Sequence, residues 1–549
     1  MEKQNVLLVF PKITAFGNYY TFPLGMAYVS AYLKSLNYNV FTLNLNEIKG
    51  DWTIYLKKII IGNNISIAAS GGASLFWNEL EILFKTIKQI DKTITTIIGG
   101  PILTATPELA MQHIPVDIGV IGEGELVSAA VLSALEKNAN LAEINGVIFR
   151  DKKGNIVKTS EPGHILNLDD LPFPDYSGFG FENWLKLDWT LQPAIKGLYF
   201  DYGEPKKIAD IIGSRSCPYN CSFCYHPLGK KYRMRSLENI FLEIDMLIEK
   251  FGVNLINFLD ELLSHNDARI SELSARIKRY NIKWLAQWRV DTVKKDIMNK
   301  IKESNVFVIG LGVESLDNTV LQSMNKKVNS DQILSALEIA YNNGVRTGSN
   351  IIIGDPAETF KSANESIDWT LKNSKYDFSL DFIMAIPDAP IYRNAVNNGI
   401  IKNELNHIKN NFPVINLTKM SDSEFNALRS KVAVINIMLK HKPLADVIDT
   451  KKISRSNNRN IYQFSVKCPL CSAISIYKYY IFSRKPITPV LCKTCYKVLK
   501  IKTAKAFPDD YNFFKSNFFY AGVLIYHSFL YRISFFRKIF FALKKIIDK

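Results

Sequence analysis

The sequence of 549 residues contains only seven cysteines, and none of them occurs before position 217. They form one group of three and one group of four: Cys217, Cys221 and Cys224, and Cys468, Cys471, Cys492 and Cys495. Because both groups have the close spacing of ligands, no cysteine remains for a disulfide framework, which excludes small disulfide-stabilised secreted domains. The N-terminal run NVLLVF also lacks the basic region and apolar core of a signal peptide, so we expect a cytoplasmic protein.

Acidic residues are few in the C-terminal third of the chain. Residues 401–549 contain 27 Lys and Arg but only 8 Asp and Glu, whereas residues 1–400 contain 41 and 44. The net charge of +16 therefore comes from the C-terminal third, which predicts contact with a membrane surface, a nucleic acid or an acidic substrate. Nucleic acid is the least favoured of these because no RNA-binding module accompanies the basic residues.

The apolar C-terminal tail is too short to cross a membrane. Its uncharged stretch, residues 516–531, has 16 residues, whereas a spanning helix needs about 20. Aromatic residues are interleaved there with basic ones, namely Arg532, Arg537, Lys538, Lys544 and Lys545. This pattern predicts a helix that lies on an anionic membrane surface, at the inner face of the membrane. A helix packed on the rest of the chain or in a dimer is the alternative.

Residues 5–150 alternate short apolar runs with helical patterns, from NVLLVF and PLGMAYVSAYLKSL to TTIIGG and VDIGVIG. Such alternation predicts a parallel, doubly wound α/β sheet of the Rossmann type, which binds its ligand at the carboxyl ends of the strands. Gly71, Gly72, Gly99 and Gly100 end strands at this edge, where a backbone without a Cβ lets a bulky ligand approach closely. Ordinary turn glycines are the alternative.

The three cysteines of the run GSRSCPYNCSFCYHP lie on one short loop. Three thiolates can bind three irons of a 4Fe-4S cluster and leave the fourth iron open to an exchangeable ligand. A zinc knuckle is the alternative, but zinc requires a fourth ligand, and only His226 is near in the sequence. We therefore expect a reactive iron–sulfur site.

The alternation resumes at Ile208 with six longer strand and helix units. Six units predict a partial (β/α)6 barrel, and the cysteine loop follows its first strand, at the end where barrels carry their sites. Arg289 is expected in the barrel interior, where it needs an anionic partner, either a protein carboxylate or that of a cofactor. Residues 151–205, rich in Pro, Asp and aromatics, are interpreted as a linker without chemistry.

The spacing Cys217-x3-Cys221-x2-Cys224, with the aromatic Phe223 before the last cysteine, resembles the signature of the radical S-adenosylmethionine (SAM) enzymes. The resemblance implies that the open iron binds the amino and carboxylate groups of SAM, and that one electron cleaves the SAM sulfonium to a 5′-deoxyadenosyl radical. It also implies SAM contacts in the segments NFLDELL, GLGVES and NIIIGDPAET, at Asp260, Glu261, Gly310, Glu314, Ser315, Ile353 and Gly354. A helix cap at Asp260 and plain barrel core at Ile353 are the alternatives.

The resemblance is less complete on the substrate side of the barrel. The segment IPDAPIYRNAVNNG is similar to the family's PGTPLY element, but Asp388 and Ala389 stand in place of its Gly and Thr, so substrate contacts there stay open. Glu358 matches the final acid of the family's fifth-strand element. Tyr225 and His226, beside the cluster, are expected to pack the loop rather than to face substrate.

The N-terminal domain resembles the cobalamin-binding domain that precedes many radical SAM enzymes. The similar segments are PLGMAYVSAYL, the GGP after the fourth strand, PEL, and GEGE at residues 122–125. The resemblance implies cobalamin contacts at Gly71, Gly72, Gly99, Gly100 and Glu123. Because no histidine precedes His113, the loop after the first strand is not expected to ligate cobalt through an imidazole. A domain that does not bind cobalamin is the alternative.

The four C-terminal cysteines form two CxxC pairs separated by 20 residues. This spacing predicts a zinc ribbon in which Cys468, Cys471, Cys492 and Cys495 bind one tetrahedral zinc. Four thiolates leave no open position, so the zinc is expected to be structural. A second iron–sulfur cluster is the alternative.

Together these patterns predict an α/β chain with a doubly wound cobalamin-binding domain, a partial radical SAM barrel, a C-terminal zinc ribbon and a helical tail. The predicted boundaries are 1–150 for the cobalamin domain, 151–205 for the linker, 206–400 for the barrel, 401–465 for a helical extension, 466–500 for the zinc ribbon and 501–549 for the tail.

The predicted function is that of a cobalamin-dependent radical SAM methyltransferase. It would methylate an unactivated centre of a small-molecule or lipid-like substrate, with electrons from a reductant such as flavodoxin or ferredoxin. One alternative is a radical cyclase or rearrangement enzyme that uses cobalamin as electron acceptor, and another is a membrane-tethered cobalamin or redox sensor. A methylthiotransferase is disfavoured because its N-terminal domain needs three cysteines, and this N-terminal domain has none.

Overall fold

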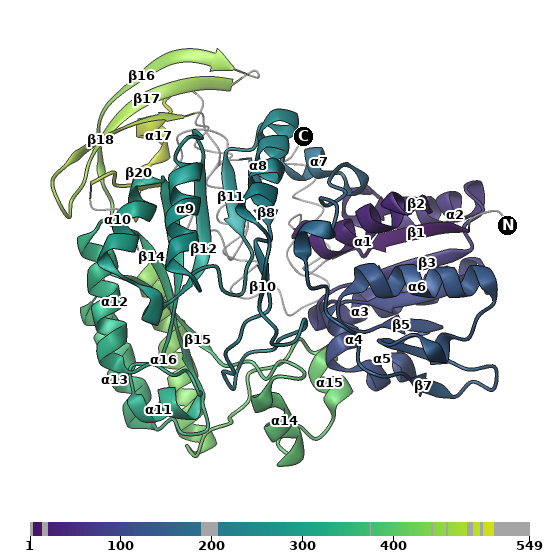
Figure 1. Cartoon of the computed structure of the whole chain (residues 1–549). Helices are drawn as coiled ribbons and strands as arrows, with labels where there is room; N and C mark the ends of the chain where they lie inside the picture. Colours follow the sequence, from purple (N-terminus) through teal and green to yellow (C-terminus); the bar gives the residue numbers. More distant parts are fainter. Residues whose placement is uncertain are drawn as a thin grey trace. The chain divides into compact units, whose positions relative to one another are not determined.

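The computed structural model describes residues 4–13, 20–187, 207–373, 375–440, 443–456, 459–479, 487–494 and 498–509. The chain forms two compact units, one of Met1–Gln192 with Lys207–Val432 and one of Pro193–Lys206 with Ala433–Lys549. The described residues of the first unit form two large sheets, each built from strands that alternate with helices, and a small two-stranded sheet (Figure 1).

The first sheet has seven strands in the order β2-β1-β3-β4-β5-β6-β7. Its strands are β1 Asn5–Phe10, β2 Asn39–Asn44, β3 Ile67–Gly71, β4 Thr95–Gly99, β5 Ile118–Val120, β6 Val147–Arg150 and β7 Ile156–Lys158. The first five pair in parallel, and β6 and β7 add an antiparallel edge. The predicted doubly wound α/β fold is therefore confirmed for the N-terminal domain.

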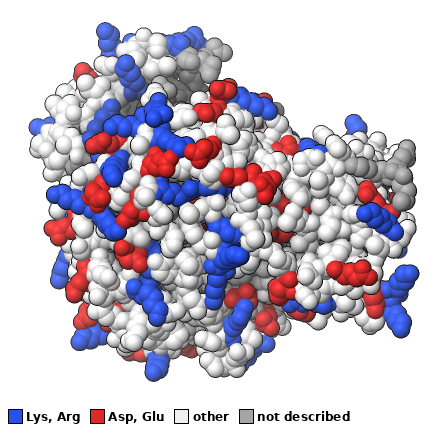
Figure 2. Space-filling model, in the orientation of Figure 1, with Lys and Arg blue, Asp and Glu red and all other residues white. Residues whose placement is uncertain are grey.

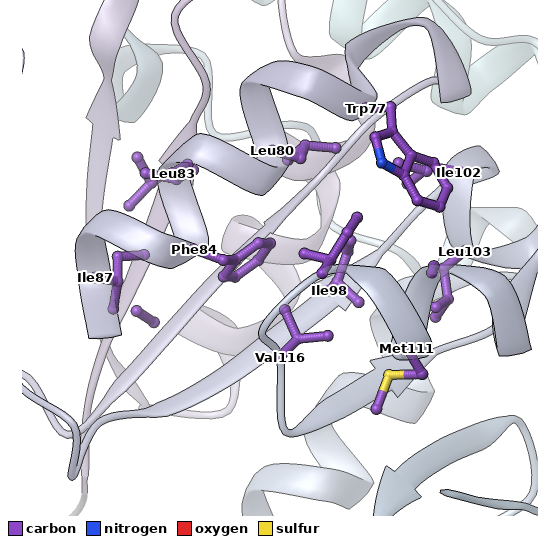
Figure 3. Close-up of a cluster of buried hydrophobic side chains, with 14 of the residues drawn as sticks. Trp77, Leu80, Leu83, Phe84, Ile87, Ile98, Ile102, Leu103, Met111 and Val116 are labelled. Atoms are coloured by element: carbon purple, nitrogen blue, oxygen red, sulfur yellow. The ribbon is translucent and has the colours of Figure 1, made fainter. Parts of the chain in front are cut away.

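A dense apolar cluster holds several helices against this sheet. The helices of the domain are α1 Leu24–Ser35, α2 Trp52–Gly62, α3 Trp77–Ile90, α4 Pro101–Ala105, α5 Pro107–His113 and α6 Gly124–Lys137. Helix α3 turns Trp77, Leu80, Leu83, Phe84 and Ile87 toward the cluster because these positions recur at helical spacing (Figure 3). Each such side chain contributes roughly 1.5–3 kcal/mol on burial, so the cluster fixes α4, which begins directly after Gly100.

The second sheet has six parallel strands in the order β15-β14-β13-β12-β11-β8. Their bounds are β8 Ile208–Ile211, β11 Leu255–Phe258, β12 Lys283–Arg289, β13 Val306–Glu314, β14 Thr347–Ile353 and β15 Asp377–Phe382. Within the described residues β15 and β8 do not pair, so the barrel is open, as six units predict. The helices that follow are α8 Leu237–Phe251, α9 Asp267–Ile277, α10 Lys295–Glu303, α11 Asn318–Ser323, α12 Ser330–Asn342, α13 Phe360–Lys372, α14 Pro390–Asn397, α15 Glu404–Lys409 and α16 Asp422–Lys440.

The linker joins the two sheets of the first unit through stacked aromatic rings. Tyr176, Phe181 and Trp184, the last two in α7 Phe181–Trp184, pack around Phe22 of the first domain. Tyr176 and Phe181 also contact Phe251 at the end of α8. The aromatic content of the linker therefore has a structural cause, since these rings hold the barrel against the first domain.

The second unit is a small β structure. Its strands are β16 Asp446–Ser456, β17 Arg459–Lys467, β18 Ile474–Tyr479, β19 Ile487–Leu491 and β20 Val498–Lys502, followed by α17 Thr503–Ala506. The helical extension predicted over residues 401–465 is therefore wrong beyond α16. The runs DVIDTKKISRS and NIYQFSVK alternate side chains with the period of a strand, and they pair as an antiparallel hairpin.

No helix in the part of the chain that the structure describes is long and apolar enough to span a membrane. The helix predicted to lie on a membrane surface falls almost wholly in residues 510–549, outside the described residues, and it stays a prediction. On the face shown in Figure 2, basic side chains are interspersed with acidic ones over most of the surface, in keeping with the near balance of charge in residues 1–400.

Candidate functional site

The three cysteines of the first group lie on a loop whose two ends are tied together. Strands β9 Ser214–Arg215 and β10 Arg233–Met234 pair in antiparallel fashion and enclose residues 216–232. The carboxylate of Asp260, at the end of β11, accepts hydrogen bonds from Gly213 N at 2.6 Å and Ser214 Oγ at 2.9 Å. Burial raises the pKa of Asp260 to about 6. The buried carboxylate thus fixes the start of the cysteine loop.

The three thiols differ in acidity: burial raises the pKa of Cys217, the hydrogen bond with Cys221 raises that of Cys224, and only the pKa of Cys221 is lowered. Cys221 is buried, whereas Cys217 and Cys224 are partly exposed. A hydrogen bond from Cys224 and the nearby charges of Lys326 and Arg289 lower the pKa of Cys221 to about 6, although burial opposes them. The thiolate is the form that binds iron. Three cysteines on one loop, next to two cationic side chains, therefore fit a 4Fe-4S cluster with three protein ligands.

Arg289 has a protein partner. Its guanidinium donates to both carboxylate oxygens of Asp291, at 2.9 and 3.1 Å, and to the backbone oxygen of Lys326 at 3.0 Å. It also lies 3.5 Å from the centre of the Tyr219 ring on the cysteine loop. A protein carboxylate, that of Asp291, is therefore one partner of Arg289, and the guanidinium packs against the cysteine loop.

A buried lysine that the sequence analysis did not identify lies beside the predicted ribose contact. Lys326 Nζ pairs with Glu314 Oε1 at 2.8 Å and lies 5.7 Å from the ring of Phe223. Its side chain is 7% exposed and that of Glu314 is 12% exposed. Glu314 adopts a φ of +65°, a strained backbone conformation that is common at binding sites. No sequence signal separates the buried Lys326 from its exposed neighbour Lys327.

Polar side chains pack directly against the bare backbone of two glycines on β13. A Cβ on Gly312 would lie 2.7 Å from Glu314 Oε1 and 2.9 Å from Lys326 Nζ, and one on Gly310 would lie 2.3 Å from Gln287 Oε1. Both positions therefore require glycine while these side chains stay where they are. Ser315 is buried instead, and its hydroxyl accepts from the Asp317 backbone N at 3.2 Å.

The end of β14 forms a tight turn around a buried carboxylate. Gly354 has a φ of +116°, and its N–H donates to Glu358 Oε2 at 2.8 Å. Ile353 is fully buried, so its side chain belongs to the barrel core, and only its backbone is available at the turn. Burial raises the pKa of Glu358 to about 7, with smaller effects from its neighbours.

This carboxylate predicts a pH dependence of stability. The unfolded chain loses the Glu358 proton near its ordinary pKa of 4.5, whereas the folded chain keeps it to about pH 7. The contribution of Glu358 to the free energy of unfolding therefore falls, by about 3 kcal/mol, as pH rises between those values. We expect Glu358→Gln to unfold in urea like the wild type at pH 5 and to be more stable at pH 8. If Glu358→Gln and the wild type were equally stable at pH 8 as well as at pH 5, the raised pKa of Glu358 would be contradicted.

Two side chains next to Cys224 contact other parts of the unit. Tyr225 Oη donates to the backbone oxygen of Pro101 at 3.1 Å, and His226 Nδ1 lies 3.0 Å from Glu261 Oε2. Glu261 is partly exposed, unlike Asp260, so of these two acids it is the one open to a ligand. Because Pro101 directly follows Gly100, Tyr225 ties the cysteine loop to the predicted cobalamin edge.

The four glycines at that edge bring two strands unusually close. Gly71 and Gly99 are paired across β3 and β4, and a Cβ on Gly71 would lie 2.4 Å from Gly99 O. A Cβ on Gly72 would lie 2.7 Å from the Phe76 ring, and Gly100 has a φ of +80°. The result is an edge of bare backbone at the carboxyl ends of parallel strands, which fits a large planar ligand such as cobalamin.

Glu123 follows β5, whose carboxyl end lies beside that of β4 in the same sheet. Its two carboxylate oxygens accept from Arg215 at 2.7 Å and from Arg233 at 2.6 Å, at the two ends of the cysteine loop. Burial alone would raise the pKa of Glu123, but the hydrogen bond and charge of Arg215 hold it below the ordinary value. The structure thus gives Glu123 two arginine partners, and its contact with cobalamin stays a prediction.

In the second unit, three of the four C-terminal cysteines converge. The Sγ atoms of Cys468, Cys471 and Cys492 all lie within 4.8 Å of one another, and those of Cys471 and Cys492 are 3.6 Å apart. Cys468 and Cys492 are buried. Cys495 lies outside the described residues.

Two family models match the chain in the order in which the sheets occur. The model of the B12 binding domain matches residues 13–132, and that of the radical SAM superfamily matches residues 211–370. The first match covers the glycine edge, and the second covers the cysteine loop with β11 to β14.

Two curated proteins and one solved structure illustrate the similarity. An uncharacterized methyltransferase of Pyrococcus horikoshii is 30% identical over 360 residues, which span 64% of this chain and 73% of the relative. The cytidylyl-2-hydroxyethylphosphonate methyltransferase of Streptomyces wedmorensis is 23% identical over 458 residues, 73% and 83% of the two chains. The radical SAM methyltransferase TsrM of Kitasatospora setae, with tryptophan and a SAM analog bound, superposes with a TM-score of 0.59 at 16% identity, covering 72% and 77%.

Proposed function

The chain belongs to the cobalamin-dependent radical SAM enzymes, and we propose that it methylates an unactivated centre of a small-molecule or lipid-like substrate. One observation carries the proposal. The residue after Cys224, Tyr225, hydrogen-bonds at 3.1 Å to Pro101, the residue after Gly100. Methyl transfer to a substrate radical requires the cluster and the methyl donor to face the same substrate, and this contact supports such a geometry.

When bound, the cluster and cobalamin supply one-electron cleavage of SAM and a transferable methyl group, with electrons from a donor such as flavodoxin or ferredoxin. Cys217, Cys221 and Cys224 would hold the cluster, and the bare backbone at Gly71, Gly72, Gly99 and Gly100 would support cobalamin. Gly312 lets Glu314 and Lys326 pack against bare backbone, and Glu314 would accept from the ribose hydroxyls of SAM. Lys326 would donate to the SAM carboxylate, because an ammonium beside a carboxylate forms a charge-assisted hydrogen bond.

Removing the ammonium of Lys326 is expected to weaken SAM binding. Losing a hydrogen bond between charged groups costs about 2 kcal/mol, or roughly 30-fold in Kd. We expect Lys326→Gln to show this loss when SAM is titrated into the reduced, reconstituted enzyme and followed by the EPR signal of the cluster. The neighbouring variant Lys327→Gln is the matched control, since Lys327 is exposed. Equal SAM affinity of the two variants would contradict the role of Lys326.

The transfer of a methyl group can be followed without knowing the substrate. The reconstituted enzyme is incubated with an extract of its host that lacks the gene, in the presence of SAM whose methyl group carries deuterium. A product that gains the labelled methyl group supports methyl transfer. A compound of the extract that is converted to a product without gaining the labelled methyl group favours cyclisation or rearrangement. Consumption of SAM without any new product overturns both reactions.

We propose further that Cys468, Cys471, Cys492 and Cys495 bind one structural zinc. The convergence of three Sγ atoms within 4.8 Å supports four-thiolate coordination. Metal analysis of the purified chain is expected to give one zinc per chain, which the variant Cys471→Ser loses while it keeps its iron. Iron in place of zinc at these cysteines would contradict the proposal and indicate a second cluster.

A further inference from the structure

Four charged side chains form a buried group between the first domain and the cysteine loop. Glu123 is the N-cap residue of α6 and Glu125 lies in its first turn, whereas Arg215 and Arg233 are directly opposite each other on β9 and β10. Arg215 bonds Glu123 at 2.7 Å and Glu125 at 2.6 Å, and Arg233 bonds Glu123 at 2.6 Å. All four side chains are at most 6% exposed. We call this group the glutamate–arginine clamp.

The clamp is needed for the local pairing of β9 with β10. Two guanidinium groups that face each other across adjacent strands repel, and burial makes each of them costly unless it is paired. Glu123 satisfies both, with one carboxylate oxygen to each arginine, and its Oε2 also accepts from the Ile165 backbone N at 2.9 Å. The arginines come from one domain and the glutamates from another, about 90 to 110 residues earlier in the chain.

The clamp also lies between the two cofactor regions. On one side, Arg215 is two residues before Cys217, and Arg233 donates to Ser216 Oγ at 3.3 Å. Ser216 in turn donates to Leu228 O at 2.9 Å, across the cysteine loop. On the other side, the backbone N of Gly122, the residue before Glu123, donates to Thr104 Oγ1 at 2.9 Å. Thr104 lies on α4, which begins directly after Gly100.

From this continuous set of contacts we infer that Glu123 and Glu125 are positioning residues that fix the iron–sulfur loop relative to the cobalamin edge. The inference rests on the proposed function. Tyr225 supports the middle of the loop through Pro101, whereas the clamp holds both of its ends. The GEGE segment, which resembles the cobalamin-domain sequence, thus acts on the cluster through two arginines.

The inference is tested first on the full chain without cofactors. Hydrogen exchange of the amides in residues 216–232 is measured by mass spectrometry for the wild type, Glu123→Gln and Glu125→Gln. We expect exchange about tenfold faster in Glu123→Gln and a smaller increase in Glu125→Gln, because Arg215 then keeps Glu123 as a partner. The matched control is Asp377→Asn, which breaks the 3.3 Å pair with Arg346 inside the barrel and should leave the loop unchanged.

The second readout uses the reconstituted enzymes. If the clamp sets the position of the loop, Glu123→Gln keeps its iron and cobalamin, but its ratio of 5′-deoxyadenosine to S-adenosylhomocysteine changes about tenfold from that of the wild type. A merely structural role lowers both products equally. Glu123→Asp, which keeps the charge, is expected to restore part of the ratio. If Glu123→Gln does not fold, Glu125→Gln decides the question by both readouts.

The inference would be overturned if the amides of residues 216–232 exchanged at the wild-type rate in both Gln variants. It would also be overturned if Asp377→Asn accelerated their exchange as much as Glu123→Gln does. Because exchange is measured without cofactors, this result is independent of the proposed function. Failure of the proposed function would instead appear in the wild type, as the absence of S-adenosylhomocysteine from the reconstituted reaction.

Discussion

Cys221→Ser is expected to abolish the formation of 5′-deoxyadenosine. Cys221 is the most buried thiol of its group, and the hydrogen bond from Cys224 lowers its pKa to about 6. Serine has nearly the same size, but its hydroxyl is less acidic than a thiol and its oxygen is a harder donor than sulfur. Serine therefore binds the iron of a sulfide cluster poorly. We expect the variant to fold, to lack the EPR signal of a reduced 4Fe-4S cluster, and to cleave SAM no faster than a reaction without protein.

The matched control is Cys471→Ser in the second group. It also replaces one thiol of a converging set, but in the separate C-terminal unit. Its cluster signal and its yield of 5′-deoxyadenosine should equal those of the wild type. If Cys221→Ser retained both properties, the loop enclosed by β9 and β10 would not be the site of the cluster.

Gly71→Ala is expected to remove cobalamin binding and to destabilise the first domain. The added Cβ would lie 2.4 Å from Gly99 O and 2.8 Å from Gly99 C, which are backbone atoms of the neighbouring strand. Such atoms cannot move aside as the end of a flexible side chain can, so β3 and β4 must separate. Overpacking of this kind costs typically 1–3 kcal/mol, and here it also distorts the edge that supports the ligand.

The effect of Gly71→Ala is measured by the absorbance of cobalamin that co-elutes with the protein and by urea unfolding. Gly62→Ala at the end of α2 is the control, because its added Cβ meets no atom within 4 Å. The control should bind cobalamin like the wild type. Wild-type cobalamin binding by Gly71→Ala would show that the glycine edge is not the cobalamin site.

Much of the fold follows from local sequence patterns. Both α/β sheets could be predicted because a buried parallel strand is a short apolar run bounded by turns. Such a run can be recognised from its own residues, without knowing which strands lie beside it. The cysteine loop could be predicted for the same reason, since three ligands of one cluster lie within eight residues. The pairing of β16 with β17 was not predicted, because residues 401–465 were interpreted as a helical extension.

The contacts that define the site depend on the tertiary structure. Glu123 was predicted to contact cobalamin because the GEGE segment resembles the cobalamin-domain sequence, but the arginines that bond it are 92 and 110 residues away, at the ends of the cysteine loop. Asp260 was predicted to contact SAM, and the sequence did not indicate that its carboxylate accepts from Gly213 and Ser214. Lys326 and Lys327 are adjacent in sequence and opposite in burial. A charged residue can be recognised in a sequence, but the partner that decides its role cannot.

The most direct measurement is the pair of products that the reconstituted full-length chain forms from SAM under anaerobic reduction, with and without cobalamin. A cobalamin-dependent radical methyltransferase should form 5′-deoxyadenosine in both reactions and S-adenosylhomocysteine only when cobalamin is present. Formation of 5′-deoxyadenosine alone in the presence of cobalamin would contradict methyl transfer. Absence of both products from a protein that contains its cluster would contradict radical chemistry altogether.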